Sequence, residues 1–123
     1  MEEVVLRTIN HEDHRYETVG DWFKRPDGSV EIRSSMLSSW QLEFLILVHE
    51  LIEWGLCKHE GITQEEVDKF DKKNVKLQSE VELGDLTFAP YRKQHCLATA
   101  VERILAAELD VPWDDYETEL NEL

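Results

Sequence analysis

The chain has 123 residues, of which 27 are Asp or Glu and 13 are Lys or Arg, so its formal net charge is -14. This length predicts a single domain over residues 1–123 that is large enough to bury a core without disulfides. A hydrophobic fraction of 41% excludes a disordered acidic tail. The negative charge disfavours nucleic-acid binding through a basic face and attraction to an anionic membrane, because both partners carry phosphates.

The two cysteines, Cys57 and Cys96, do not form a CxxC motif, and their apolar helical surroundings predict free thiols in the core. The first residues lack the basic segment and apolar run of a signal peptide. The longest apolar run covers residues 44–48, which is too short to cross a bilayer. We therefore expect a cytoplasmic protein with no membrane association.

The first third of the chain predicts strands, over about residues 4–33. β-Branched residues gather between positions 4 and 9, as is typical of a strand. Pro26-Asp27-Gly28 indicates a turn between two alternating segments, because Pro presets the first turn dihedral and Gly accepts a positive φ. We expect a hairpin over about residues 16–33.

The rest of the chain predicts three helices, over about residues 39–59, 63–76 and 90–109. Ser38 or Ser39 can cap the first helix and Gly61 can end it, whereas Thr63-Gln-Glu-Glu66 is a capping box for the second. Residues 77–89 predict a loop, and residues 111–123 form an acidic tail. The fold class is therefore α+β, with a small N-terminal antiparallel sheet packed on a three-helix core.

The central helix contains polar groups on an apolar background. Apolar residues surround it on every side between positions 42 and 52, which predicts a buried helix. His49 and Glu53 nevertheless lie one turn apart on the same face. A buried carboxylate without a partner costs several kcal/mol, so Glu53 must meet a cation or share a proton.

His49-Glu50-Leu51-Ile52-Glu53 reads HExxE and resembles the zincin helix HExxH, with glutamate in place of the second histidine. The i, i+4 spacing places His49 and Glu53 where both can ligate one metal ion. The resemblance implies that Glu50 is the general base that activates a water molecule. It covers five residues and departs from the zincin pattern at one ligand.

The other two helices add polar residues that we expect to face inward. Val67 and Phe70 mark the inward side of the second helix, and Asp71 and Asn74 lie on that side. The third helix has one stripe formed by His95, Thr99, Glu102 and Ala106. Beside it lies an apolar face formed by Leu97, Val101, Ile104 and Leu105.

We predict a metal site between the three helices with His49, Glu53, Asp71 and His95 as ligands. Mixed nitrogen and oxygen ligands suit zinc above all, with manganese, iron and magnesium as other divalent candidates. Glu102 lies two turns from His95 and should not ligate the same ion. The alternative is a satisfied polar network that only fixes the helix register.

The remaining histidines show no such pattern. His11 and His14 lie in a charged segment and His59 lies at a helix end. We expect all three to be solvated.

A longer resemblance spans most of the chain. The order of Tyr16-Glu-Thr-Val-Gly-Asp-Trp, the Pro-Asp-Gly turn, His49-Glu-Leu-Ile-Glu, Val67-Asp-Lys-Phe-Asp and His95 followed by Ala100-Val-Glu-Arg-Ile-Leu-Ala-Ala-Glu-Leu resembles a family of small phage and prophage proteins. It implies a bacterial or phage-infected host and no particular chemistry.

Three functions remain as hypotheses. The first is a metal-dependent hydrolase acting on a small molecule or peptide. The second is a nucleoside triphosphate pyrophosphatase, because Glu50-x-x-Glu53 and Asp68-x-x-Asp71 resemble the acidic clusters of MazG-like enzymes, which use magnesium. The third is a non-enzymatic inhibitor whose acidic tail, around Trp113 and Tyr116, contacts a basic protein partner.

Overall fold

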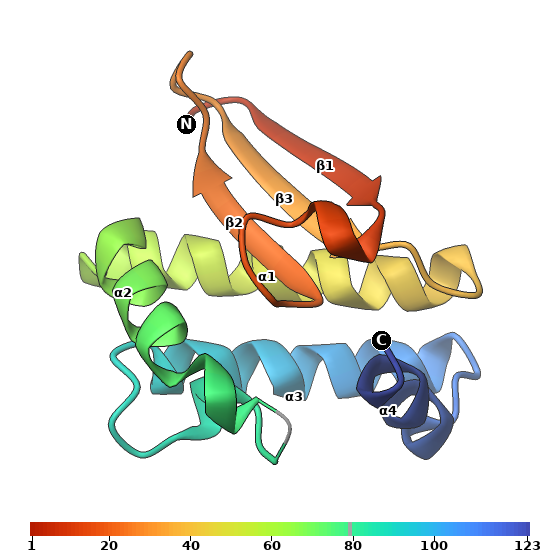
Figure 1. Ribbon diagram of the computed structural model, residues 1–123. Helices are drawn as coiled ribbons and strands as arrows, with labels where there is room; N and C mark the ends of the chain where they lie inside the picture. Colours follow the sequence, from red (N-terminus) through yellow and green to blue (C-terminus); the bar gives the residue numbers. More distant parts are fainter. Residues whose placement is uncertain (79) are drawn as a thin grey trace.

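The computed structural model describes residues 1–78 and 80–123 and has an α+β fold (Figure 1). The strands are β1 (Val4–Ile9), β2 (Gly20–Lys24) and β3 (Val30–Ser35), and the helices are α1 (Trp40–Glu60), α2 (Gln64–Asn74), α3 (Arg92–Glu108) and α4 (Trp113–Asn121). Three short 3-10 turns are η1 (His11–Asp13), η2 (Val75–Leu77) and η3 (Leu83–Asp85). The predicted fold class is confirmed.

The sheet has the strand order β1-β3-β2. β2 and β3 form the predicted antiparallel hairpin, with Trp22 opposite Ile32 and Gly28 in the turn at a φ of 92°. β1 pairs with the other edge of β3 in parallel, so the sheet is mixed. The connection over residues 10–19 is long enough to leave room for β3 between β1 and β2.

Helix α1 lies between the sheet and α3, which explains why it is apolar on every side (Figure 1). Ser39 caps its start by accepting a hydrogen bond from the Leu42 N–H, and Gly61 ends it at a φ of 74°. The predicted capping box of α2 is present between Thr63 and Glu66. These local signals were sufficient to locate both helices in the sequence.

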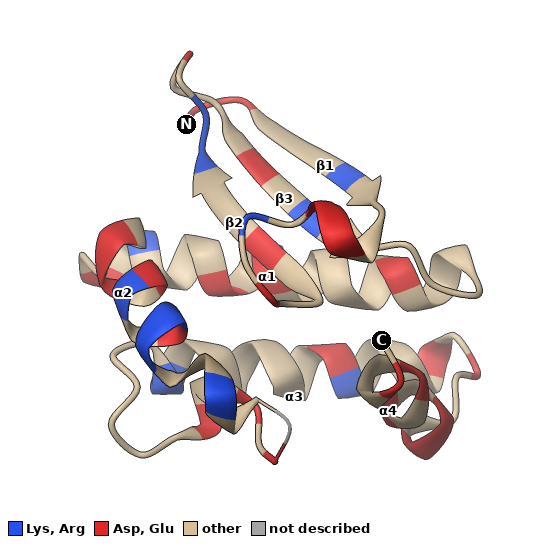
Figure 2. Cartoon of the chain, in the orientation of Figure 1, with Lys and Arg blue, Asp and Glu red and all other residues tan. Residues whose placement is uncertain are grey.

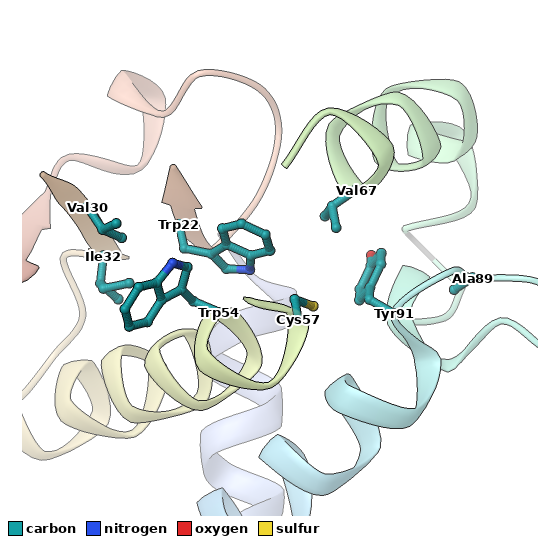
Figure 3. Packing of buried hydrophobic residues seen from close by; sticks show 8 residues of the cluster. All are labelled: Trp22, Val30, Ile32, Trp54, Cys57, Val67, Ala89 and Tyr91. Atoms are coloured by element: carbon teal, nitrogen blue, oxygen red, sulfur yellow. The ribbon is translucent and has the colours of Figure 1, made fainter. Parts of the chain in front are cut away.

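Two apolar clusters form the core at opposite ends of α1. Figure 3 shows the first, where Trp22 and Trp54 pack beneath the sheet and Val67 faces Tyr91. The second contains Leu42, Leu45, Ile46, Ala106 and Tyr116. His49 and Glu53 lie on α1 between the two clusters, so the polar site occupies the middle of the molecule.

The acidic tail folds into α4. Tyr116 is buried in the second cluster, and Trp113 and Leu120 pack against it at helical spacing. Figure 2 shows acidic residues along α4. The aromatic residues give this segment an apolar face, and that face was missed because the charges dominate its composition.

Helix α3 is rotated relative to the prediction. Its buried side carries His95, Ala98, Glu102 and Ala106, whereas Leu97 and Ile104 are exposed. The predicted apolar face was therefore wrong for these two residues. The small side chains of Ala98 and Ala106 let α3 pack closely on α1.

The two cysteines differ in exposure. Cys57 is buried as expected, but Cys96 is exposed, and both thiols are free. Among the described residues, no helix combines the length and apolar character that a membrane span requires.

Candidate metal centre

Three of the predicted ligands meet in a buried triangle. His49 Nε2 lies 3.3 Å from Glu53 Oε2, and His95 Nδ1 lies 3.2 Å from each of these atoms. Ligand atoms bound tetrahedrally at zinc distances are separated by about 3.3–3.4 Å. His49, Glu53 and His95 could therefore hold a metal ion.

The contact on the outer side of the His49 ring determines which of its two nitrogens carries the proton. Nδ1 lies 2.7 Å from Glu102 Oε1, a distance typical of a charge-assisted hydrogen bond in which Nδ1–H donates. Neutral imidazole then keeps its lone pair on Nε2, toward Glu53 and His95. Glu102 thus orients His49 from outside the triangle, as carboxylates commonly do for metal-binding histidines.

In the His95 ring the roles of the two nitrogens are exchanged relative to His49. Its Nε2 lies 3.3 Å from Glu82 Oε2 and 3.4 Å from Asp85 Oδ1, so donation on that side leaves the lone pair on Nδ1. The triangle then contains three acceptor atoms. Three acceptors in contact need a cation between them, which is either a metal ion or bound protons.

Without a metal ion, protons fill this role. Burial alone would lower the pKa of His95, but hydrogen bonds to Glu53 and Glu82 outweigh it and raise the pKa to about 10. Burial would raise the pKa of Glu53, and the two histidines instead lower it to about 2. The polar network is thus a satisfied metal-free state, whose protons a metal ion would displace.

Trp22 fixes the second oxygen of Glu53. Its indole Nε1–H donates to Glu53 Oε1 over 3.1 Å, leaving Oε2 for the triangle. The contact joins β2 to α1 inside the first core cluster. This role could not be predicted from the sequence, because a strand tryptophan carries no signal of its partner.

Glu50 lies beside the triangle in a cleft of about 840 Å³, which His49, Glu53 and His95 also line. Burial and the neighbouring Glu53 charge raise the pKa of Glu50 well above its usual value. A Cβ atom at Gly20 would lie 2.6 Å from Glu50 Oε1, so the glycine makes room for this carboxylate. Glu50 therefore lines the cleft together with the three residues of the triangle.

The structure does not bring Asp71 into the triangle. Its Oδ2 accepts a hydrogen bond from Tyr16 over 3.1 Å, and Tyr91 donates to Oδ1. Burial raises the pKa of Asp71 to about 6. It faces inward and lines the same cleft, but both of its oxygens already have partners.

Asp68 and Asn74 of α2 also have partners outside the triangle. Arg15 donates to both oxygens of Asp68, over 2.9 and 3.0 Å. Asn74 donates to the carbonyl of Phe70 in its own helix over 2.9 Å, so it does not contribute to the triangle.

Gly84 in η3 packs directly on the His95 ring. A Cβ atom there would overlap the imidazole, with His95 Cγ and Nδ1 as its nearest neighbours. The segment Glu82–Asp85 thereby closes over His95 from a region that the sequence showed only as a loop. Gly84 was the one available signal, because a glycine can mark a close approach of backbone to a side chain.

Replacing Gly84 with alanine should displace the His95 ring and weaken metal binding by about 10–100-fold, the usual effect of losing support around a ligand. Isothermal titration calorimetry with zinc measures this affinity. Gly55→Ala is the matched control, because no atom lies within 4 Å of a Cβ at that position in α1. Equal zinc affinity of Gly84→Ala and the wild type would contradict the close packing.

Two of the histidines that we expected to be solvated are in fact half-buried. His11 Nδ1 lies 2.8 Å and His14 Nε2 lies 2.9 Å from the Ser35 hydroxyl. That expectation was wrong because residues 10–15 fold back onto the end of β3. His59 is exposed, as predicted.

The protein is expected to lose stability in acid because of the half-buried His14. Burial, followed by the nearby His11 and Arg33, lowers its pKa to about 4, although Glu17 acts in the opposite direction. Between pH 6.5 and 4 the unfolded chain therefore binds more protons than the folded one, so stability falls as pH falls. The expected loss is about 1–2 kcal/mol after allowance for solvent screening of a half-exposed ring.

Urea unfolding at pH 7 and at pH 4.5 measures this effect. His14→Gln should remove that part of the difference between the two pH values that comes from this ring. The idea fails if the variant and the wild type lose equal stability on acidification.

The comparisons with known proteins give no family for the chain. No protein-family model, curated protein or solved structure matches it.

Proposed function

We propose that this protein binds one divalent metal ion through His49, Glu53 and His95 and uses it in a hydrolytic reaction. The observation that supports this proposal most directly is the triangle of three acceptor atoms 3.2–3.3 Å apart. Two imidazoles and one carboxylate are a common ligand set of catalytic zinc, which keeps a further position open. Manganese and iron accept the same ligands, whereas magnesium prefers oxygen and fits two histidines poorly.

The cleft supports catalysis over a purely structural ion. It reaches all three ligands and Glu50, so a substrate entering it meets the metal position and a carboxylate together. A zinc ion held by three protein ligands supplies a Lewis acid and lowers the pKa of water at the open position. In this proposal Glu50 takes the proton from the attacking water and delivers it to the leaving group.

The pyrophosphatase alternative has weaker support. A pair of magnesium ions would need free oxygens on both acidic clusters. Both oxygens of Asp68 accept hydrogen bonds from Arg15, and those of Asp71 accept hydrogen bonds from two tyrosines. Glu53 is in contact with His49 and His95. The arrangement therefore favours one ion on the histidines.

In the inhibitor alternative, the aromatic residues of the tail would have to contact the partner, but they pack inside the protein. Tyr116 is buried and Trp113 packs beside it, with ring centroids 5.3 Å apart. Asp114, Asp115 and Glu117 remain exposed, but the predicted contact surface is reduced to charges. A basic protein partner is a separate proposal that this packing does not favour.

The first test measures the metal content of the protein. Protein purified without chelators should contain close to one equivalent of zinc, iron or manganese by elemental analysis. Stripped protein should regain thermal stability when zinc is added, because an ion that binds only the folded state stabilises it. His49→Ala should lose both the ion and the shift in melting temperature. Absence of an ion in the wild type, together with unchanged melting of His49→Ala, would leave only the polar network.

The second test separates chemistry from binding. Glu50→Gln should keep its zinc but lose about 10²–10⁴-fold in hydrolysis rate, the usual contribution of a general base. A panel of activated esters and peptides provides the assay, and Glu60→Gln, exposed at the end of α1, is the matched control. Full activity in Glu50→Gln would exclude it as the base. Release of pyrophosphate from a nucleotide panel with magnesium would instead favour the alternative enzyme.

A further inference from the structure

Helix α3 carries an exposed apolar surface on the side that does not face α1. Leu97 is 52% exposed and Ile104 is 64% exposed. The helix packs against α1, η3 and α4. This surface is independent of the triangle, because His95 and Glu102 lie on the buried side.

The exposed residues follow a regular spacing. Positions 93, 97, 100, 104 and 107 are separated alternately by four and three residues, which is the spacing of a seam between two packed helices. All five are exposed, and we call them the α3 stripe: Lys93, Leu97, Ala100, Ile104 and Ala107. A single surface helix needs no such seam on its solvent side, so the pattern indicates a second helix as the occupant.

We propose that the α3 stripe binds the α3 stripe of a second copy of this chain, antiparallel and about a two-fold axis near Ala100. In that arrangement Leu97 faces Ile104 of the second copy, and each such pair occurs twice, as an isologous interface requires. Ala100 lies at the centre, where its small side chain allows close approach.

Two opposite charges at the ends of α3 complement each other in a pair of copies and give the orientation of the second copy. Lys93 is the first residue of the α3 stripe, and Glu108 lies beside the stripe near the end of the helix; both are exposed. The antiparallel register that pairs Leu97 with Ile104 also pairs Lys93 with Glu108 of the second copy. A parallel pairing would instead place Lys93 against Lys93 and align the two helix dipoles unfavourably.

The size of the surface sets the strength of the contact. Two helices of 17 residues bury less than the roughly 1,600 Å² of a standard interface. The net charge of -14 on each copy also opposes association. The dimer is therefore reversible, and its population increases with protein concentration.

Analytical ultracentrifugation of the full chain over a range of concentrations tests the proposal. The wild type should show a concentration-dependent dimer, and Ile104→Lys should weaken it by at least about tenfold, because a charge replaces a central apolar contact. Leu6→Lys is the matched control, since Leu6 is 50% exposed on β1, away from the stripe. A wild type that stays monomeric, or equal dimerisation of wild type and Ile104→Lys, overturns the proposal.

A charge exchange tests the antiparallel register. Lys93→Glu and Glu108→Lys should each weaken the dimer, and the double variant should recover the wild-type affinity, because the pair is then only reversed. A double variant weaker than either single variant would overturn the antiparallel arrangement. Circular dichroism confirms that each variant is folded, as expected for exposed positions.

Discussion

Replacing Glu53 with glutamine is expected to lower zinc affinity by more than about 100-fold, because loss of an outer partner of a ligand already costs 10–100-fold. The amide keeps the shape of the carboxylate but removes the negative charge that balances the ion. The variant also loses the anion that two imidazoles share in the metal-free protein, over 3.3 Å from His49 and 3.2 Å from His95. Competition with a chromophoric chelator measures the affinity.

Glu102→Gln provides a graded control for Glu53→Gln. It leaves all three atoms of the triangle in place and removes only the carboxylate that receives His49 Nδ1–H over 2.7 Å. Its zinc affinity should fall by about 10–100-fold, less than that of Glu53→Gln. If Glu53→Gln bound zinc as tightly as the wild type, Glu53 would be part of a polar network and not a ligand.

The parts of this site that could be predicted from sequence are those with a local cause. Helical periodicity alone places His49 and Glu53 on one face of α1, and the same period places His95 and Glu102 on one side of α3. Both pairs lie as predicted. Glu102 was also expected not to share the ion with His95, and it contacts the far side of the His49 ring instead.

The remaining parts depend on how separate elements meet. Asp71 was correctly placed on the inward side of α2, but periodicity gives a direction and not a distance, and Tyr91 at the start of α3 donates a hydrogen bond to one of its oxygens. Glu82 and Asp85 reach His95 only after a loop closes over α3. Trp22 reaches Glu53 only because β2 packs on α1.

The sheet shows the same division. The Pro26-Asp27-Gly28 turn determines the hairpin between β2 and β3, because adjacent strands with a tight turn pair with each other. No local signal states that β1 pairs with β3 in parallel, since that contact depends on the path of the chain between residues 10 and 19. The exposure of Leu97 and Ile104 was missed for a related reason, because a helix with apolar residues on two sides does not reveal which side faces the core.

Replacing Tyr116 with alanine is expected to destabilise the protein by about 3–5 kcal/mol, the usual cost of removing a large aromatic side chain from a core. Tyr116 is 1% exposed and packs in the second core cluster with Leu42, Leu45 and Ile46 of α1. Removing the ring would leave a cavity between α4 and α1 and detach the helix that the acidic tail forms. Equilibrium urea unfolding, followed by circular dichroism, measures the loss.

Tyr116→Phe distinguishes packing from hydrogen bonding. The Tyr116 hydroxyl is buried near Glu102 but makes no hydrogen bond of regular geometry among the described residues, and burial together with the Glu102 charge raises the pKa of this tyrosine. The phenylalanine variant should therefore be as stable as the wild type or slightly more stable, because it removes an unsatisfied buried polar group and keeps the ring.

The two variants together determine what the acidic tail contributes. If packing of the aromatic ring holds α4, a chain that ends before Trp113 should lose at least as much stability as Tyr116→Ala, because it removes Trp113 and Leu120 from the second cluster as well as Tyr116. The exposed Asp114, Asp115 and Glu117 would then contribute little to folding, since surface charges are worth only tenths of a kcal/mol each. Unchanged stability in Tyr116→Ala would show instead that α4 is only loosely held, and its exposed carboxylates would then be the reason to look for a basic partner.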